Sequence, residues 1–203
     1  MEKWEIKGHT LEFDDNTHTY YVDGVITPSV TQIIKWVYPN IYKDIDPRIL
    51  ERARELGHKM HKDIEDYENG LEVDASVELE SYIKLKSFFD WKVEHCEIPI
   101  IIFNGDFPVC AGRIDQIINI YDKLCVNDLK RTKEVHYKEL TLQLSLYALG
   151  YEQCYNRAII GGYCTHLKKD VGEFIEIILK EDLAISKVME YIKQSDKDDD
   201  FEW

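Results

Sequence analysis

GRIDQIINIYDKLCVNDLKRTKEVHYKELTLQLSLYALGY, residues 112–151, contains two strand patterns joined by a turn, followed by a helix pattern. Apolar and β-branched residues dominate positions 113–120 and 124–129, and the Tyr-Asp-Lys sequence at 121–123 is typical of a turn. Residues 138–153 repeat leucine at helical spacing, so this segment is expected to be an amphipathic helix. The stretch therefore predicts a β-hairpin that leads into a helix.

Three charged side chains of this hairpin are expected to meet at one end of it. Side chains alternate along a strand, so Asp128 and Lys130 share one face while Leu129 points into the core. Pairing of the two strands brings Asp115 to the same end. Two carboxylates and an ammonium group would then converge at the edge of a small sheet.

Such a cluster suits a divalent metal ion, because Mg²⁺ prefers carboxylate oxygens and takes one or two of them together with water and phosphate. A metal bound there would polarise a phosphodiester and lower the pKa of a bound water. Lys130 would orient that water or stabilise the developing charge. The alternative is a pair of solvated strand-end aspartates beside a surface lysine, which a D-x-K sequence alone does not exclude.

The composition indicates one globular domain. A chain of 203 residues with 44% hydrophobic residues can form an ordinary core. We expect a single domain at 1–195, with an N-terminal hairpin and helices in 1–95 and a sheet in 96–195. The acidic tail at 196–203, DKDDDFEW, is either a solvated charge run or an acidic-aromatic motif for a protein partner.

The net charge of −14 argues against a protein that holds nucleic acid on a general basic surface. The segment with Lys130, Arg131, Lys133 and Lys138 is locally basic, however, and adjoins the expected cluster. An enzyme that binds its substrate through a metal ion and a local basic groove can be acidic elsewhere.

The cysteine pattern and the hydropathy indicate a cytoplasmic protein with no membrane partner. Five cysteines without a repeated short spacing are typical of a reducing compartment and give no zinc or iron–sulfur signature. No apolar run approaches the roughly 20 residues that span a bilayer. Residues 1–13 contain no signal-peptide core.

The N-terminal half predicts a hairpin and three helices. Residues 11–25 have the strand and turn pattern of a hairpin, and Thr27 is expected to cap a short helix from Pro28 to about Trp36. Asp46-Pro47 begins the longest helix, which ends at Asn69-Gly70. A further helix is expected from Ser76 to about Glu94.

The longest helix carries an apolar stripe with a histidine at its margin. The stripe consists of Leu50, Ala53, Gly57, Met60, Ile64 and Tyr67. A glycine in mid-helix costs about 1 kcal/mol relative to alanine, so we expect a close approach to the backbone at Gly57. His61 lies one turn later; it is either a partly buried structural histidine or a nitrogen ligand for the metal.

The rest of the chain supplies more strands. A strand is expected at Glu97–Phe103, where Pro99 marks an edge, and Asn104-Gly105 predicts a hairpin into a strand at Phe107–Ala111. Strands at 157–168 and 173–180, joined at Lys169-Asp170, precede a helix at 181–194. This order of elements indicates a mixed α/β (α+β) sandwich rather than a doubly wound fold.

On the helix after the D-x-K strand, Gln143, Tyr147 and Tyr151 share one face. Such a face is commonly an ordinary polar-aromatic surface. The functional alternative is that its amide and hydroxyl groups hydrogen-bond a nucleic-acid backbone or brace the carboxylates.

Four motifs in this order resemble the PD-(D/E)xK nuclease superfamily, in its RecB-like exonuclease branch. They are Gly57-x-x-x-His61, Gly112-Arg113-Ile114-Asp115, Asp128-Leu129-Lys130 and Gln143-x-x-x-Tyr147. The segment Thr27-Pro28-Ser29-Val30-Thr31 is similar to the one ahead of the core in mitochondrial genome maintenance exonucleases and their phage relatives. The resemblance covers residues 57–151 and extends nearly to the N-terminus.

The resemblance implies a restriction-endonuclease-like core and a Mg²⁺- or Mn²⁺-dependent DNA exonuclease that acts on single-stranded or duplex ends. A role in phage or mobile-element recombination, replication or repair would fit. The implied metal ligands are His61, Asp115, Asp128 and the backbone carbonyl of Leu129. The catalytic residues are Asp115, Asp128 and Lys130, and the residues that contact DNA or brace the site are Gln143, Tyr147, Arg131, Thr132 and Lys133. Glu97 occupies the position of an additional acidic residue in some relatives.

Some branches of the superfamily carry four cysteines that hold an iron–sulfur cluster. The cysteines here do not have that spacing, so no cluster is expected. Two alternatives remain: a structure-specific or nicking endonuclease with the same site, and a catalytically weak binding or inhibitory module that uses its acidic surface.

Overall fold

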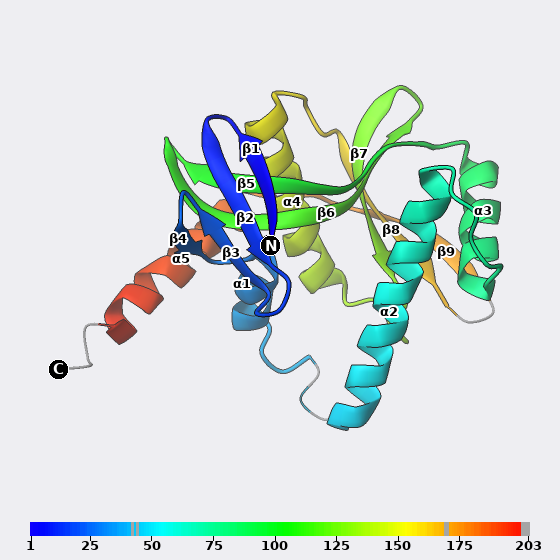
Figure 1. The fold of residues 1–203 in the computed structure, drawn as a ribbon, viewed down its shortest axis with the longest axis horizontal. Coiled ribbons are helices and arrows are strands. Elements are labelled where there is room, and N and C mark those ends of the chain that lie inside the picture. Colours follow the sequence, from blue (N-terminus) through cyan, green and yellow to red (C-terminus); the bar gives the residue numbers. More distant parts are fainter. Residues whose placement is uncertain (42, 44, 169–170, 200–203) are drawn as a thin grey trace.

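The expected mixed α/β class is confirmed by the computed structural model, which has five helices and nine strands in two sheets among its described residues (Figure 1). It describes residues 1–41, 43, 45–168 and 171–199, and of 196–199 the backbone alone. The expected joint at Lys169-Asp170 and the last four residues of the acidic tail lie outside this range.

The elements follow one another as strands, helices, strands, a helix, two strands and a helix. The strands are β1 Glu2–Ile6, β2 His9–Asp14, β3 Thr19–Val22, β4 Val25–Thr27, β5 Lys92–Asn104, β6 Phe107–Ile120, β7 Lys123–Lys130, β8 Gly161–Leu167 and β9 Gly172–Ile177. The helices are α1 Val30–Val37, α2 Pro47–Glu68, α3 Val77–Phe89, α4 Tyr137–Tyr155 and α5 Glu181–Asp199.

The larger sheet has the order β5-β6-β7-β8-β9, in which only the β7–β8 pair is parallel. The predicted hairpin forms with a two-residue turn, and both turn residues, Tyr121 and Asp122, have the positive φ that such turns require. The smaller sheet is a meander of β1 to β4, so the expected N-terminal hairpin gains a strand on each side. The expected edge position of Pro99 is confirmed, because β5 is an outer strand.

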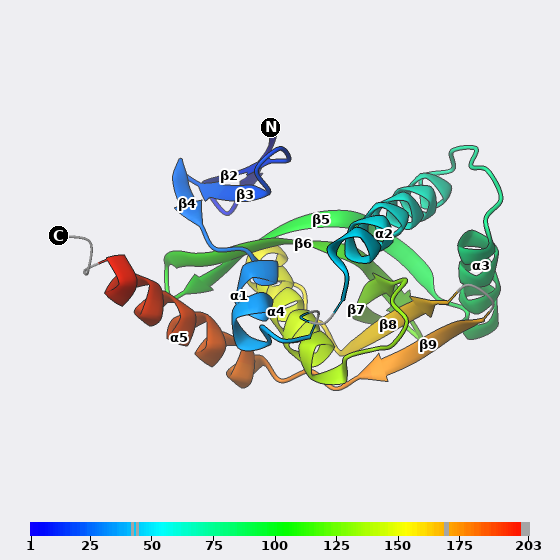
Figure 2. The same ribbon diagram turned by 90° about the horizontal axis from the view of Figure 1, so that it is seen from below.

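The larger sheet is covered on both faces (Figure 2). Ile101, Phe103 and Ala111 pack against the β1–β4 meander, while their neighbours Ile100 and Ile102 pack against α4. The meander and α2 lie on one side of the sheet, and α1, α4 and α5 lie on the other. Each face of the sheet therefore has its own hydrophobic core, because successive side chains along β5 and β6 point to opposite faces.

The Pro-Ser-Val-Thr segment attaches α1 to β6. The N-cap is Ser29 rather than the expected Thr27, because the Ser29 and Gln32 side chains form a reciprocal capping box. The Ala111 N–H donates to the Pro28 carbonyl. A side chain at Gly112 would meet Val30 at 3.0 Å and Tyr147 at 3.3 Å. The glycine thus permits close packing, and it lies inside one continuous strand where the sequence patterns predicted two, at 107–111 and 113–120.

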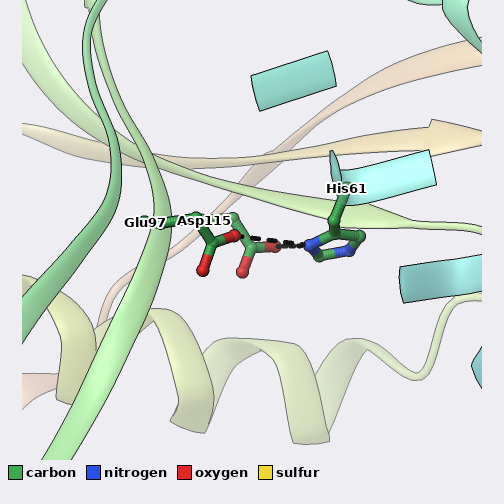
Figure 3. Close-up of side chains that lie close together, drawn as sticks. All are labelled: His61, Glu97 and Asp115. Carbon is green, nitrogen blue, oxygen red and sulfur yellow. Dashed lines mark ion pairs between the residues drawn. The ribbon is translucent and has the colours of Figure 1, made fainter. Parts of the chain in front are cut away.

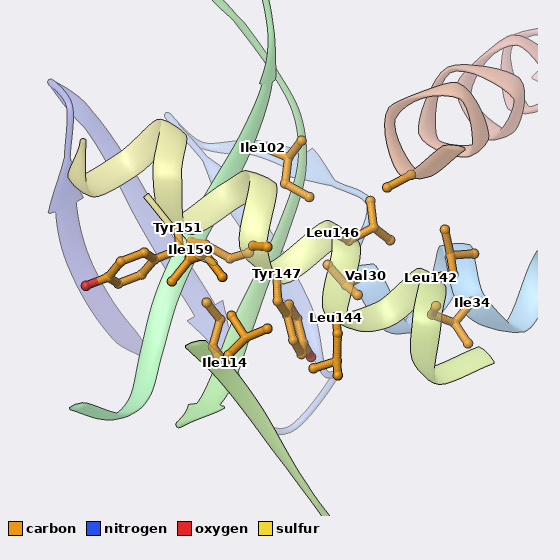
Figure 4. Packing of buried hydrophobic residues seen from close by; sticks show 14 of the residues in the cluster. Val30, Ile34, Ile102, Ile114, Leu142, Leu144, Leu146, Tyr147, Tyr151 and Ile159 are labelled. Atoms are coloured by element: carbon orange, nitrogen blue, oxygen red, sulfur yellow. The ribbon is translucent and has the colours of Figure 1, made fainter. Parts of the chain in front are cut away.

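Helix α4 is buried almost all round, which corrects the expectation of an amphipathic helix. Leucines on different sides of it, including Leu142, Leu144 and Leu146, are all buried (Figure 4). The reason is tertiary: the larger sheet covers one side, and α1 and α5 cover the other. The face with Tyr147 and Tyr151 is therefore core as well.

Helix α2 has the predicted ends, with Asp46 as N-cap and Asn69 as C-cap. Its apolar stripe is only partly core, because within α2 only Met60 and Ile64 are buried. The expected close approach at Gly57 is wrong, since no described atom other than its two chain neighbours and the surrounding backbone of α2 lies within 4 Å of the position that a Cβ would take there. The N-terminal half of α2 therefore projects beyond the core.

Three boundaries also differ from expectation. Helix α3 ends at Phe89 because Asp90 adopts the left-handed conformation, and β5 begins at Lys92 rather than Glu97. Helix α5 continues to Asp199, so the acidic tail begins as helix.

A buried row of polar side chains crosses three strands on the α2 and α3 side of the sheet. Asn127 Nδ2 donates to Gln116 Oε1 (2.8 Å), and Thr165 Oγ1 donates to Asn127 Oδ1 (2.9 Å). Gln116 Nε2 in turn donates to the Tyr82 hydroxyl (2.9 Å), which donates to Glu68. Because buried polar groups are costly when unpaired, this row favours one register for β6, β7 and β8.

Asn127→Leu should destabilise the protein by about 2–3 kcal/mol, because it leaves buried polar groups of Gln116 and Thr165 without partners. Urea unfolding followed by circular dichroism would measure the change. Asn119→Leu is the matched control: Asn119 is half-buried on the neighbouring strand β6 and makes one longer bond, to Glu94 (3.3 Å). Equal effects of the two substitutions would contradict the role given to the polar row.

Candidate metal centre

The site begins where the pairing of β6 with β7 ends. The last paired residues are Gln116 and Asn127. Beyond them Asp115 Oδ2 accepts a hydrogen bond from the Leu129 backbone N–H (2.8 Å). A side-chain carboxylate thus replaces the next carbonyl of the ladder. Asp115 is thereby placed beside the D-x-K strand, as the hairpin pattern predicted.

His61 reaches the same point from α2. Its Nε2 lies 2.9 Å from the Leu129 carbonyl oxygen, which can only accept, so Nε2 carries a proton. Its Nδ1 faces two carboxylates and lies 3.8 Å from both Asp115 Oδ2 and Glu97 Oε1 (Figure 3). The backbone of Leu129 therefore bridges His61 and Asp115.

Glu97 joins the cluster through an unusual backbone conformation. It has φ +49 in the middle of β5, a conformation that is uncommon for a residue other than glycine and costs of order 1 kcal/mol or more. Ligand atoms of His61, Glu97 and Asp115 lie within 4.8 Å of one another. Strained backbone that aims a carboxylate at a histidine and a second carboxylate is typical of a functional site.

Asp128 and Lys130 share one face of β7, as predicted, and that face looks toward α4. Lys130 Nζ donates to Asp128 Oδ1 (2.9 Å) and to Gln143 Oε1 (3.3 Å). Asp128 is only 1% exposed. Its Oδ2 lies 2.8 Å from Nζ but outside hydrogen-bond geometry, so this buried oxygen has no hydrogen-bond donor among the described residues.

Helix α4 braces Lys130 through two side chains. Gln143 Nε2 donates to the Tyr147 hydroxyl (3.3 Å), and Gln143 Oε1 accepts from Lys130. Tyr147 is 5% exposed, so its hydroxyl orients Gln143 and is not placed to touch DNA. Gln143 is half-buried and faces the cluster.

The charges of the cluster perturb one another. Burial raises the pKa of Asp128 to about 6. Lys130 lowers this pKa, and the charge of Asp115 raises it further. Burial also raises the pKa of Asp115, with His61 opposing it. Burial disfavours protonation of His61, but Asp115 and Glu97 outweigh it and raise the pKa of the imidazole to about 9. The interacting groups are thus three carboxyl groups, of Glu97, Asp115 and Asp128, and two cationic side chains, of His61 and Lys130.

This donor set fits a divalent cation. His61, Glu97 and Asp115 offer one nitrogen and two oxygens at close range. Asp128, whose charge interacts with those of Asp115 and His61, has a buried oxygen with no hydrogen-bond donor among the described residues. The Leu129 carbonyl accepts the His61 N–H here, an arrangement typical of the outer shell of a metal-bound histidine. Its expected role as a direct ligand stays a prediction.

A groove of about 690 Å³ leads into the cluster between α2 and residues 129–136. One wall is apolar and comes from α2 and the chain before it: Ile41, Ile45, Ile49, Leu50 and Ala53. The other wall contains Lys130, Arg131, Thr132 and Lys133. The apolar stripe predicted on α2 thus continues out of the core and lines the groove.

The three residues after the D-x-K motif differ in how freely they face this groove. Arg131 Nε is held by Glu78 (2.7 Å), and Lys133 is exposed. The Thr132 carbonyl accepts a bond from buried His166 Nε2 (2.7 Å). These bonds tether the segment to the core, so it forms a fixed wall.

Arg113 is a charged neighbour of the cluster to which the sequence patterns assigned no role. Its Nε lies 3.7 Å from Glu97 Oε2. The sequence could have identified Arg113 as a neighbour of the site, because it lies two residues before Asp115 on one strand and residues at that spacing share a face.

No family model and no curated protein matches the chain. One solved structure, the "Crystal structure of SSO0001", is similar over 83% of this chain and 76% of that chain, with 20% identity and a TM-score of 0.48. None of the described helices is long and apolar enough to cross a membrane.

Asp115→Asn should raise the melting temperature of the metal-free protein by roughly 2–4 °C at pH 8. Because the folded pKa of Asp115 lies above its ordinary value, its charged form lowers stability at high pH. This deficit, and with it the gain from asparagine, shrinks as the pH falls and the carboxyl takes up a proton. Asparagine can still accept the Leu129 N–H.

Mn²⁺ should then stabilise the native protein but not Asp115→Asn in the same thermal assay. Asp106→Asn, in the exposed turn between β5 and β6, is the control and should behave like the native protein. A lower melting temperature for Asp115→Asn at pH 8, or equal stabilisation of both proteins by Mn²⁺, would argue against a cation site at this carboxylate.

Proposed function

We propose that this protein is a metal-dependent deoxyribonuclease of the PD-(D/E)xK type that degrades DNA from its ends. The observation that carries the proposal is the convergence of His61, Glu97 and Asp115 with the Asp128–Lys130 pair at the splayed end of β6 and β7. Two solvated surface aspartates would not be buried, and a lysine beside them would not be held by a side chain of helix α4, as Lys130 is by Gln143.

The order of the motifs along the chain supports the same proposal. Each of the four motifs contributes a side chain to this one cluster or to its bracing, although they come from α2, β6, β7 and α4. An inactive binding module has no chemical need for a lysine braced beside a buried aspartate.

The groove supports a polynucleotide substrate. Among the described residues that line it, four basic side chains, Arg54, Lys130, Arg131 and Lys133, stand against two acidic ones, Glu134 and Glu139. Three of these basic side chains, Arg54, Lys130 and Arg131, also pair with carboxylates, so exposed Lys133 is the cation offered most directly to a phosphate. Phosphates would be attracted to this wall, and base faces would pack on the apolar wall.

The chemistry follows from the positions of the side chains. A divalent cation held by His61, Glu97, Asp115 and Asp128 would polarise the phosphodiester and lower the pKa of an attacking water. Lys130 is fixed by Asp128 and Gln143 at the edge of that site, where it orients the water and stabilises charge that develops on the phosphate. Tyr147 keeps Gln143 in place.

One gel distinguishes the candidate activities. The protein is incubated with Mg²⁺ or Mn²⁺ and 5′-labelled linear single strands, linear duplex or closed circular DNA. We expect loss of the linear DNA with circles intact. Nicked or cut circles would instead favour an endonuclease of the same fold. No cleavage of any substrate with either metal would favour a binding or inhibitory module.

Asp128→Asn and Lys130→Gln should each lower the rate of DNA cleavage by about 10²–10³-fold, because each removes a group that acts on the developing charge. Circular dichroism should show both proteins folded, since asparagine keeps the shape of the Asp128 side chain and glutamine keeps a hydrogen-bonding group at position 130. Asp106→Asn serves as the surface control. Wild-type cleavage by either variant would refute the assigned catalytic pair.

His61→Gln should weaken binding of Mn²⁺ by about 10–100-fold, and binding of Mg²⁺ by less, because an amide oxygen replaces a nitrogen donor. Calorimetric titration without DNA measures both affinities and does not depend on catalysis. His58→Gln is the matched control, since His58 is exposed on the same helix three residues earlier and also lines the groove. Unchanged Mn²⁺ affinity in His61→Gln would exclude His61 as a ligand.

A further inference from the structure

Arg113 lies beside Glu97 at the metal cluster and is not among the residues that line the groove. Its Nε lies 3.7 Å from Glu97 Oε2, while the other oxygen of the same carboxylate, Oε1, faces His61. The groove reaches the cluster at His61 and Lys130. A strand that continued from the groove past His61 and Glu97 would come to Arg113.

The guanidinium of Arg113 is held in a fixed orientation by the N-terminal meander. It lies 5.5 Å from the ring centre of Trp4 and 5.1 Å from that of Phe13, within the range of cation–π contacts. The Tyr20 side chain also lies close enough to interact with its charge. An arginine held in this way loses little freedom on binding a further group.

The outer fork of the guanidinium is occupied by a carboxylate. Arg113 Nη1 lies 3.1 Å from Glu2 Oε2, and Nη2 lies 3.2 Å from Glu2 Oε1, which is a two-bond pairing of planar groups. The Glu2 side chain is 49% exposed, whereas that of Arg113 is 22% exposed. Carboxylate and phosphate oxygens fit this fork in the same way, so Glu2 occupies the position that a phosphate would take.

We propose that Arg113 binds the terminal phosphate of the DNA strand, a phosphomonoester, and that this phosphate displaces Glu2 from the guanidinium. The inference rests on the proposed nuclease function and adds that the site receives a phosphorylated end of the DNA strand. The β1–β4 meander stands over β5 and β6 (Figure 2), and its Trp4 and Phe13 rings contact the guanidinium of Arg113.

The charge of the ligand explains why a strand end is favoured over an internal position. A phosphomonoester carries a charge of about −1.5 to −2 at neutral pH, whereas each internal phosphodiester carries −1. A ligand that replaces the Glu2 carboxylate must compensate for the ion pair that it breaks. The monoester has the greater charge to do so, and it offers three oxygens to the fork.

The test compares DNA strands that differ only in the phosphate at one end. Rates with Mn²⁺ are measured for 5′-phosphorylated, 3′-phosphorylated and unphosphorylated linear strands of one sequence. We expect kcat/KM to be about tenfold higher for one phosphorylated end, the size of a charge-assisted two-bond contact. Arg113→Lys should reduce that ratio to about one, because lysine keeps the charge but not the fork.

Glu2→Gln should lower the KM for the phosphorylated strand, because the competing carboxylate is gone. Glu12→Gln is the matched control: Glu12 forms a comparable cross-strand pair with Lys3 in the same sheet and should leave the ratio unchanged. No preference for either phosphorylated end in the native protein, or an unchanged ratio in Arg113→Lys, would overturn the proposal.

A binding measurement separates this inference from the proposed function. Calorimetry with Ca²⁺ compares trinucleotides with and without a terminal phosphate, using native protein and Arg113→Lys. Tighter binding of a phosphorylated trinucleotide that depends on Arg113 would support the phosphate site even if no DNA were cleaved. Cleavage without this difference in binding would refute the phosphate site and leave the nuclease proposal intact.

Discussion

The hydrogen bond from the Leu129 N–H to Asp115 is the interaction on which the site depends. It forms because the β6–β7 ladder stops at Gln116 and Asn127, so the next backbone donor needs another acceptor. The carboxylate that satisfies it becomes fixed between β7 and His61. The buried polar row on the far face of the same strands holds the ladder in register up to that point. The position at which the β6–β7 ladder ends therefore determines where Asp115 joins the charge cluster.

The buried carboxylates of the cluster oppose the stability of the folded chain. Burial raises the pKa of Asp115 and Asp128, although His61 and Lys130 counteract that rise. Glu97 adds a strained backbone. A divalent cation would offset the electrostatic part of these costs. Sites that are unfavourable without their ligand are common where function, rather than stability, selects the residues.

Local patterns in the sequence predicted the part of the site that lies on one hairpin. Strand alternation and a turn placed Asp115, Asp128 and Lys130 together, since those rules need only neighbouring residues. Glu97 was identified as a candidate by resemblance alone, because its orientation depends on a left-handed residue that no pattern marks. The burial of α4 and the contact of Arg113 with Glu2, 111 positions apart, arise from packing between distant elements. Packing between distant elements also decides whether anything lies close to Gly57, so the local helix pattern could not predict it.

The apolar stripe of α2 shows how one pattern can serve two purposes. Met60 and Ile64 are buried under the sheet, whereas Ile49, a turn or more before Gly57, is 63% exposed. The same face of the helix therefore passes from core to groove wall within a few turns. Its apolar character persists there although no core covers it, and a basic wall faces it. Under the proposed function, the apolar wall would contact the bases of a nucleic-acid strand and the wall with Lys130, Arg131 and Lys133 its phosphates. Complementarity in that one groove would then be enough for an acidic protein to receive DNA.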